Sequence, residues 1–104
     1  MAQFDVYENE EPTSRNEIPY LLDVQNAIHA GLSTRVIVPL VITSSPREKV
    51  DKLCPQFQVL GQRVMMSTPE IGSYPIGDLR HSVASLREHR TEIISAIDFL
   101  LSGF

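Results

Sequence analysis

Residues 86–104, LREHRTEIISAIDFLLSGF, form the stretch that decides the fold of this 104-residue chain. Apolar side chains recur there at spacings of three, four and seven residues, which places them on one face of an α-helix. Ser85 and Glu88 have the spacing of a capping box, which predicts where the helix begins. We expect an amphipathic helix with one face buried. That face consists of Leu86, Ile93, Ile97, Leu100 and Phe104, widened by Ile94 and Leu101.

The end of this helix is unusual, because the apolar Phe104 follows Ser102 and Gly103 with no polar tail behind it. Two interpretations stay open. Gly103 could cap the helix while Phe104 folds back onto the core, since glycine is common just after a helix. Alternatively, the helix end, with Leu101, Ser102, Gly103 and Phe104, could be displayed as a contact surface. Helical spacing alone does not separate the two.

Upstream of the helix, short apolar segments separated by polar loops predict β-strands. Pro39 lies inside one of them and cannot donate a sheet hydrogen bond, so it predicts an edge position or a bulge where the strand bends or changes partner. Asp23, inside another apolar run, either faces solvent or is held by hydrogen bonds. The expected strands are residues 4–7, 20–24, 35–41 and 71–76, with a hairpin of residues 56–60 and 62–66 turning at Gly61.

Several short strands followed by one helix indicate a single domain over residues 1–104. The expected fold class is mainly β with α: a twisted antiparallel sheet or half-open barrel with a long C-terminal helix packed on it. Hydrophobic residues make up 42% and charged residues 21% of the chain, as in ordinary globular proteins. The net charge of −4 disfavours a protein that neutralises phosphates, so a protein partner is the better expectation.

No apolar run approaches the roughly 20 residues that span a bilayer. The N-terminal residues MAQFDVYENEE lack the basic flank and apolar segment of a secretory signal, so we expect a cytoplasmic protein. Cys54 has no cysteine partner and is expected to be buried. Met65 and Met66 are expected in the core or an interface rather than as metal ligands. We expect no metal, no cofactor and no catalytic residue.

Six short segments of the chain carry a resemblance to a known family: QFDVY at residues 3–7, YLLDVQ at 20–25, RVIVPL at 35–40, VMMST at 64–68, YPI at 74–76 and EIISAIDFLLSGF at 92–104. Taken in this order, they resemble the CcdB family, the toxins of plasmid and chromosomal toxin–antitoxin modules that poison DNA gyrase. The loops at residues 8–19, 42–55 and 77–84 match that family least. The resemblance implies the half-open, SH3-like barrel that CcdB shares with MazF-type toxins, assembled as a homodimer with the two helices near the dyad.

The resemblance also implies partners and a mechanism without catalysis. The toxin dimer would enter the cavity between two gyrase A subunits, trap the cleaved gyrase–DNA complex and block resealing. A CcdA-like antitoxin with a disordered C-terminal segment would neutralise it, and the acidic balance of this chain suits a positively charged segment. By position, the gyrase-binding residues are Ile28, His29, Asp98, Leu101, Ser102, Gly103 and Phe104. Met65, Met66 and Leu100 are implied at the dimer interface, with a plain core role as the open alternative.

Two positions depart from the family pattern. The best-known form of the motif has tryptophan at the position of Ser102, where its ring stacks on an arginine of gyrase. The loss of that contact removes about 0.5–2 kcal/mol. His29 replaces an aliphatic residue, which predicts weaker gyrase binding below about pH 6.5, where an imidazole becomes charged.

Two alternative functions stay open. The same barrel-like fold occurs in endoribonuclease toxins of the MazF and Kid group, which need a basic RNA groove and a general acid–base pair. Arg35 and Arg15 are the candidates for RNA contact, although the acidic composition disfavours it. The second alternative follows from Ser102: a decayed homologue that only binds an antitoxin.

Overall fold

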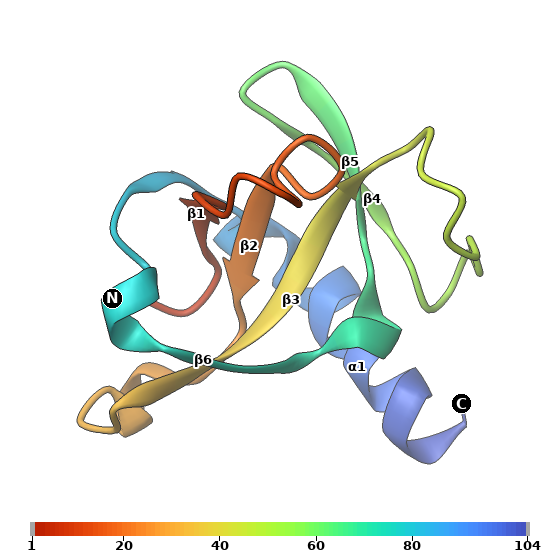
Figure 1. Cartoon of the computed structure of the whole chain (residues 1–104). Coiled ribbons are helices and arrows are strands. Elements are labelled where there is room, and N and C mark those ends of the chain that lie inside the picture. Colours follow the sequence, from red (N-terminus) through yellow and green to blue (C-terminus); the bar gives the residue numbers. More distant parts are fainter. Residues whose placement is uncertain (1, 104) are drawn as a thin grey trace.

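The computed structural model describes residues 2–103. They form one curled antiparallel sheet, followed by one α-helix near the C-terminus of the chain (Figure 1). The strands run in the order β4-β5-β3-β2-β1-β7, and β6 pairs with β3 outside this path. The predicted fold class, a mainly β half-open barrel with a C-terminal helix, is confirmed. The strands are β1 (Asp5–Glu8), β2 (Tyr20–Asp23), β3 (Thr34–Ile42), β4 (Gln56–Val59), β5 (Gln62–Met66), β6 (Gly72–Pro75) and β7 (Ser82–Ser85), and the helix is α1 (Arg90–Ser102).

Strand β3 is the centre of the sheet. It pairs with β2 along one side, while on the other side its first half pairs with β6 and its second half with β5. Pro39 lies at the point where the partner changes, and its carbonyl accepts a hydrogen bond from the Ser67 amide at 2.9 Å. A strand residue directs its carbonyl and its N–H to the same side, so the missing proline donor costs no bond to β2. The predicted edge position is therefore wrong, whereas the predicted change of partner is confirmed.

The helix and the sheet enclose the main core. Helix α1 lies behind the sheet in Figure 1 and contributes Ile93 and Ala96, both fully buried, to that core. The opposite face of the sheet is covered by loops and holds two smaller apolar clusters. The main core contains Val6, Leu22, Val38, Leu40, Phe57, Val64 and Met66; the smaller clusters contain Tyr7, Leu21, Ile37 and Leu79, and Val41, Cys54 and Met65. The burial expected for Cys54 is confirmed.

The start of the helix differs from the prediction. Helix α1 begins at Arg90, after a short 3₁₀ turn, η4 (Arg87–His89). The capping box is wrong, because the Ser85 hydroxyl accepts a hydrogen bond from the Arg87 amide at 3.3 Å and α1 has no side-chain cap. Ser85 ends strand β7, which pairs with β1 and was not predicted. Its sequence, SVAS, is short and only partly apolar, so it lacks the pattern that marks a strand.

The β4–β5 hairpin turns at Leu60 and Gly61, so the turn predicted at Gly61 is confirmed, although Leu60 belongs to the turn and not to the strand. Both residues have positive φ angles, 50° and 80°, which is the combination that a two-residue type I′ turn requires. The turn places Leu60 in solvent with 67% of its surface exposed, at the end of the molecule away from the C-terminus (Figure 1).

Candidate partner-binding surface

The C-terminal end of α1 is displayed rather than buried. The apolar stripe leaves the core after Ile97. Leu100 is 36% exposed, so its predicted burial is wrong, whereas Leu101 is 77% exposed, as the interpretation of a displayed helix end predicted. Gly103 adopts the left-handed conformation, with φ 80°, and its amide donates to the Phe99 carbonyl at 2.9 Å. This bond caps the helix, as one interpretation of the sequence predicted. Leu101, Ser102 and Gly103 therefore form an exposed and capped helix end, here called the helix tip; Phe104 lies outside the described residues.

A second exposed group lies in the loop between β2 and β3. A 3₁₀ turn, η1 (Ala27–His29), presents Ile28 with 81% of its surface exposed, and His29 is exposed beside it. The Asn26 side chain accepts a hydrogen bond from the Ile28 amide at 3.0 Å and so caps the turn. Figure 1 shows this loop and the helix tip at opposite ends of the same side of the molecule, with β6 between them. Within one chain, Asp98 therefore lies close to the helix tip, whereas Ile28 and His29 lie far from both (Figure 1).

The residues implied at a dimer interface divide into two groups. Met65 and Met66 have no exposed surface, and their side chains lie in clusters on opposite faces of the sheet. Their burial within one chain favours the core role that the sequence left open. Leu100 is partly exposed beside the helix tip and remains available for contact with a second copy.

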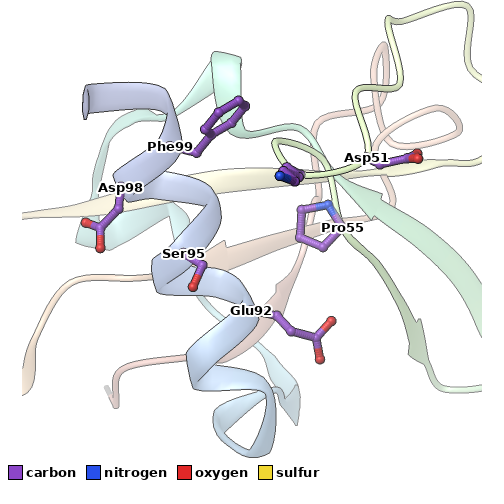
Figure 2. Close-up of a pocket in the computed structure, with 7 residues that line it drawn as sticks. Asp51, Pro55, Glu92, Ser95, Asp98 and Phe99 are labelled. Atoms are coloured by element: carbon purple, nitrogen blue, oxygen red, sulfur yellow. The ribbon is translucent and has the colours of Figure 1, made fainter. Parts of the chain in front are cut away.

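A groove of about 400 Å³ runs between α1 and the segment at residues 51–55. Figure 2 shows Glu92 and Phe99 pointing from α1 toward this segment, with Pro55 opposite them. Three carboxylates and one ammonium group line the groove, so its charge favours a positively charged partner. Sequence reasoning missed the groove because its two walls lie about 40 residues apart in the chain. The lining residues are Asp51, Lys52, Pro55, Glu92, Ser95, Asp98 and Phe99, so Asp98 belongs both to the groove and to the face that ends in the helix tip.

An ion-pair cluster around Arg47 fixes the loop between β3 and β4, which includes the groove wall at residues 51–55. Arg47 pairs with the carboxylates of Glu17 and Glu70, and the Ser67 hydroxyl donates to Glu70 at 2.9 Å. The hydrogen bond from Arg47 lowers the pKa of Glu70 most, and Ser67 and the charge of Arg47 lower it further against the effect of burial. Arg47 therefore ties the loop to two distant parts of the chain.

This cluster predicts a pH-dependent contribution to stability. The Glu70 pKa is depressed in the folded protein, so its stabilising effect is complete above the unfolded pKa and is lost as pH falls through the folded pKa. Since the Glu70 side chain is 40% exposed, screening limits the effect to about 0.5–1 kcal/mol. Urea unfolding should show Glu70→Gln less stable than wild type at pH 7, with the gap closing below about pH 4. Glu48→Gln, at an exposed position outside the cluster, should show no such gap; a pH-independent gap for Glu70→Gln would contradict this origin.

The buried side chains bear on the endoribonuclease alternative. Arg35 is fully buried and pairs with the equally buried Asp23, with Nε to Oδ2 at 2.8 Å. Asp23 is thus held by hydrogen bonds, which was one of its two expected states, and Arg35 is inaccessible to RNA. Burial raises the pKa of the neighbouring Tyr7 phenol, and the charges of Asp5 and Asp23 add to that effect. In residues 2–103, no three side chains of His, Cys, Asp or Glu are grouped to hold a metal ion.

Comparison with known proteins supplies the family. None of the helices within residues 2–103 has the length and apolar character needed to cross a membrane. A search of curated proteins finds no match to the chain. The family model described as CcdB protein matches residues 3–103, almost the whole sequence. The chain, with its displayed helix tip on a curled antiparallel sheet, belongs to the CcdB family of toxin–antitoxin toxins.

Proposed function

We propose that this toxin acts by binding the DNA gyrase A subunit, trapping the cleaved gyrase–DNA complex and blocking resealing. The single observation that supports it best is the exposure of Leu101, at 77%, on a capped helix end in a CcdB-family chain. An exposed leucine on a helix whose end is fixed by a hydrogen bond can enter a partner's pocket with little loss of conformational freedom. The mechanism is binding and requires no catalytic residue.

The proposed gyrase-binding residues are Asp98, Leu101, Ser102, Gly103 and Phe104 at the C-terminus, with Ile28 and His29 on the β2–β3 loop. In a homodimer with two-fold symmetry, two copies of each group would face the two gyrase A subunits. The two groups lie apart within one chain, so in such a dimer the distance that matters would be the one between the C-terminal group of one copy and the loop group of the other. The expected loss of binding through protonation of His29 stays a prediction.

The groove beside α1 is proposed to receive part of the antitoxin. Its excess of carboxylates suits a segment carrying lysine or arginine, in line with the net charge of −4 of the whole chain. Because Asp98 lies in both surfaces, an antitoxin bound there would approach the residues proposed to contact gyrase.

A gyrase cleavage assay tests the proposal. Purified protein, supercoiled DNA, gyrase and ATP are combined, and wild type is compared with a chain truncated before Ser102. Linear DNA should accumulate with wild type but not with the truncated chain, which lacks Gly103 and hence the cap of α1. Circular dichroism and gel filtration establish that both proteins are folded and equally associated.

The other outcomes discriminate between the functions. If neither protein yields linear DNA although both are folded, gyrase poisoning is the wrong function for this chain. Growth arrest on expression without antitoxin would still separate an active toxin from a decayed homologue. Cleavage of RNA by the purified protein would restore the endoribonuclease alternative, against the burial of Arg35.

A further inference from the structure

The β2–β3 loop holds its shape without a core of its own. Every residue from Asn26 to Thr34 is exposed, and η1 buries none of its side chains. Apolar contacts therefore cannot fix the position of Ile28. Short-range hydrogen bonds, such as the Ala30 amide to the Ala27 carbonyl at 3.1 Å, shape the turn but do not attach it to the sheet.

Besides the hydrogen bond from the Ile76 amide to the Ser33 carbonyl at 3.0 Å near the end of the loop, the side chain of Gln25 attaches the turn to the sheet. Its Nε2 donates to the carbonyl of His29 at 3.1 Å and to the carbonyl of Thr34 at 3.4 Å. Its Oε1 accepts from the Val36 amide in β3 at 3.0 Å. One partly buried amide group thus bonds to η1, to the start of β3 and to a residue within β3, across the base of the loop.

Gln25 is itself fixed by the buried ion pair. Its amide donates to Asp23 Oδ1 at 3.0 Å, and its carbonyl accepts from Arg35 Nη2 at 2.9 Å. Asp23 and Arg35 are both fully buried, so these two bonds join the Gln25 backbone to the interior of the protein. A continuous chain of hydrogen bonds runs from the buried pair, through Gln25, to the exposed turn.

We propose that Gln25, held by the Asp23–Arg35 pair, is a positioning residue that pre-organises Ile28 and His29 for binding to gyrase. This inference rests on the proposed function, because it assigns Gln25 a role in the same contact. A loop already ordered before association loses less conformational freedom on binding than a mobile one. Gln25 has no need to touch gyrase, because it acts through Ile28 and His29.

The test uses Gln25→Met in the full-length protein, which keeps side-chain length and removes all three hydrogen bonds of the amide group. Binding to purified gyrase A is measured by titration calorimetry, and we expect it to weaken about three- to tenfold. In an Ile28→Ala background the same substitution should weaken binding by a smaller factor, because one of the two side chains that it positions is absent. Gln58→Met, at an exposed position on β4, is the matched control and should bind like wild type.

Hydrogen exchange gives a second readout that does not depend on gyrase. The amides of His29, Ala30 and Leu32 should exchange faster in Gln25→Met, whereas those in α1 should not change. Equal gyrase binding by Gln25→Met and wild type would overturn the inference. So would a loss of the same factor with and without Ile28, which would indicate a general structural role. If wild type itself fails to bind gyrase A, the proposed function fails, and unchanged exchange in the loop would separately refute the positioning.

Discussion

An Arg35→Met variant is expected to lose about 3–5 kcal/mol of unfolding free energy, the largest effect that we predict for a single substitution in this chain. The substitution removes the cation and leaves the Asp23 carboxylate with no exposed surface and no opposite charge. A buried unpaired charge is costly because the interior of the protein cannot replace the water that it has lost. The bond from Arg35 to the Gln25 carbonyl is lost as well.

The double variant Asp23→Leu, Arg35→Met identifies the cause. It removes both charges, so it should be more stable than Arg35→Met alone, even though it buries no ion pair. Arg35 Nη1 has no hydrogen-bond partner among the described residues, so the native pair is incompletely satisfied, which limits the loss that the double variant shows relative to wild type. Denaturant unfolding at one fixed protein concentration measures all the variants, since concentration affects the stability of any protein that self-associates.

Arg63→Met, at an exposed position on β5, is the matched control for this experiment. It makes the same chemical change on the surface and should alter stability by no more than about 0.5 kcal/mol. If Arg35→Met unfolds at the same denaturant concentration as wild type, Arg35 does not offset the cost of burying the Asp23 carboxylate. The pair would then not be the stabilising contact that its geometry indicates.

The fold could be predicted largely from local patterns. Alternation of apolar residues marks a strand and the 3.6-residue period marks a helix, and both patterns are visible within a few residues of sequence. The strand that was not predicted, residues 82–85, forms through backbone hydrogen bonds to β1. Its conformation therefore depends on a partner about 80 residues away in the chain. The same pairing determines the start of α1, because it places Ser85 in a strand rather than at a helix cap.

The candidate site was predictable only in part, for similar reasons. The family resemblance places the proposed gyrase-binding residues by position, but it cannot show that Leu101 is exposed while Ile97 packs against the core. Asp23 and Arg35 each look like isolated charges in apolar segments, and only the antiparallel pairing of β2 with β3 brings them together. The groove beside α1 likewise exists only once residues 51–55 fold against the helix.

A Leu101→Asp variant is expected to bind gyrase A at least about thirtyfold more weakly than wild type, or about 2 kcal/mol, the loss typical of a central apolar contact residue. The leucine is 77% exposed, so its replacement removes little buried packing and should leave the free energy of unfolding within about 0.5 kcal/mol of wild type. The loss would therefore report on the contact and not on the fold.

Leu60→Asp is the matched control for Leu101→Asp, because it makes the same change at a residue that is 67% exposed. Leu60 lies at the β4–β5 turn, away from the helix tip (Figure 1), and its left-handed backbone accommodates aspartate. It should bind gyrase A and generate linear DNA like wild type. If both variants weaken binding equally, the added negative charge accounts for the loss and the helix tip has no special role. If only Leu101→Asp does so, the apolar side chain at the helix tip contributes directly to the gyrase contact.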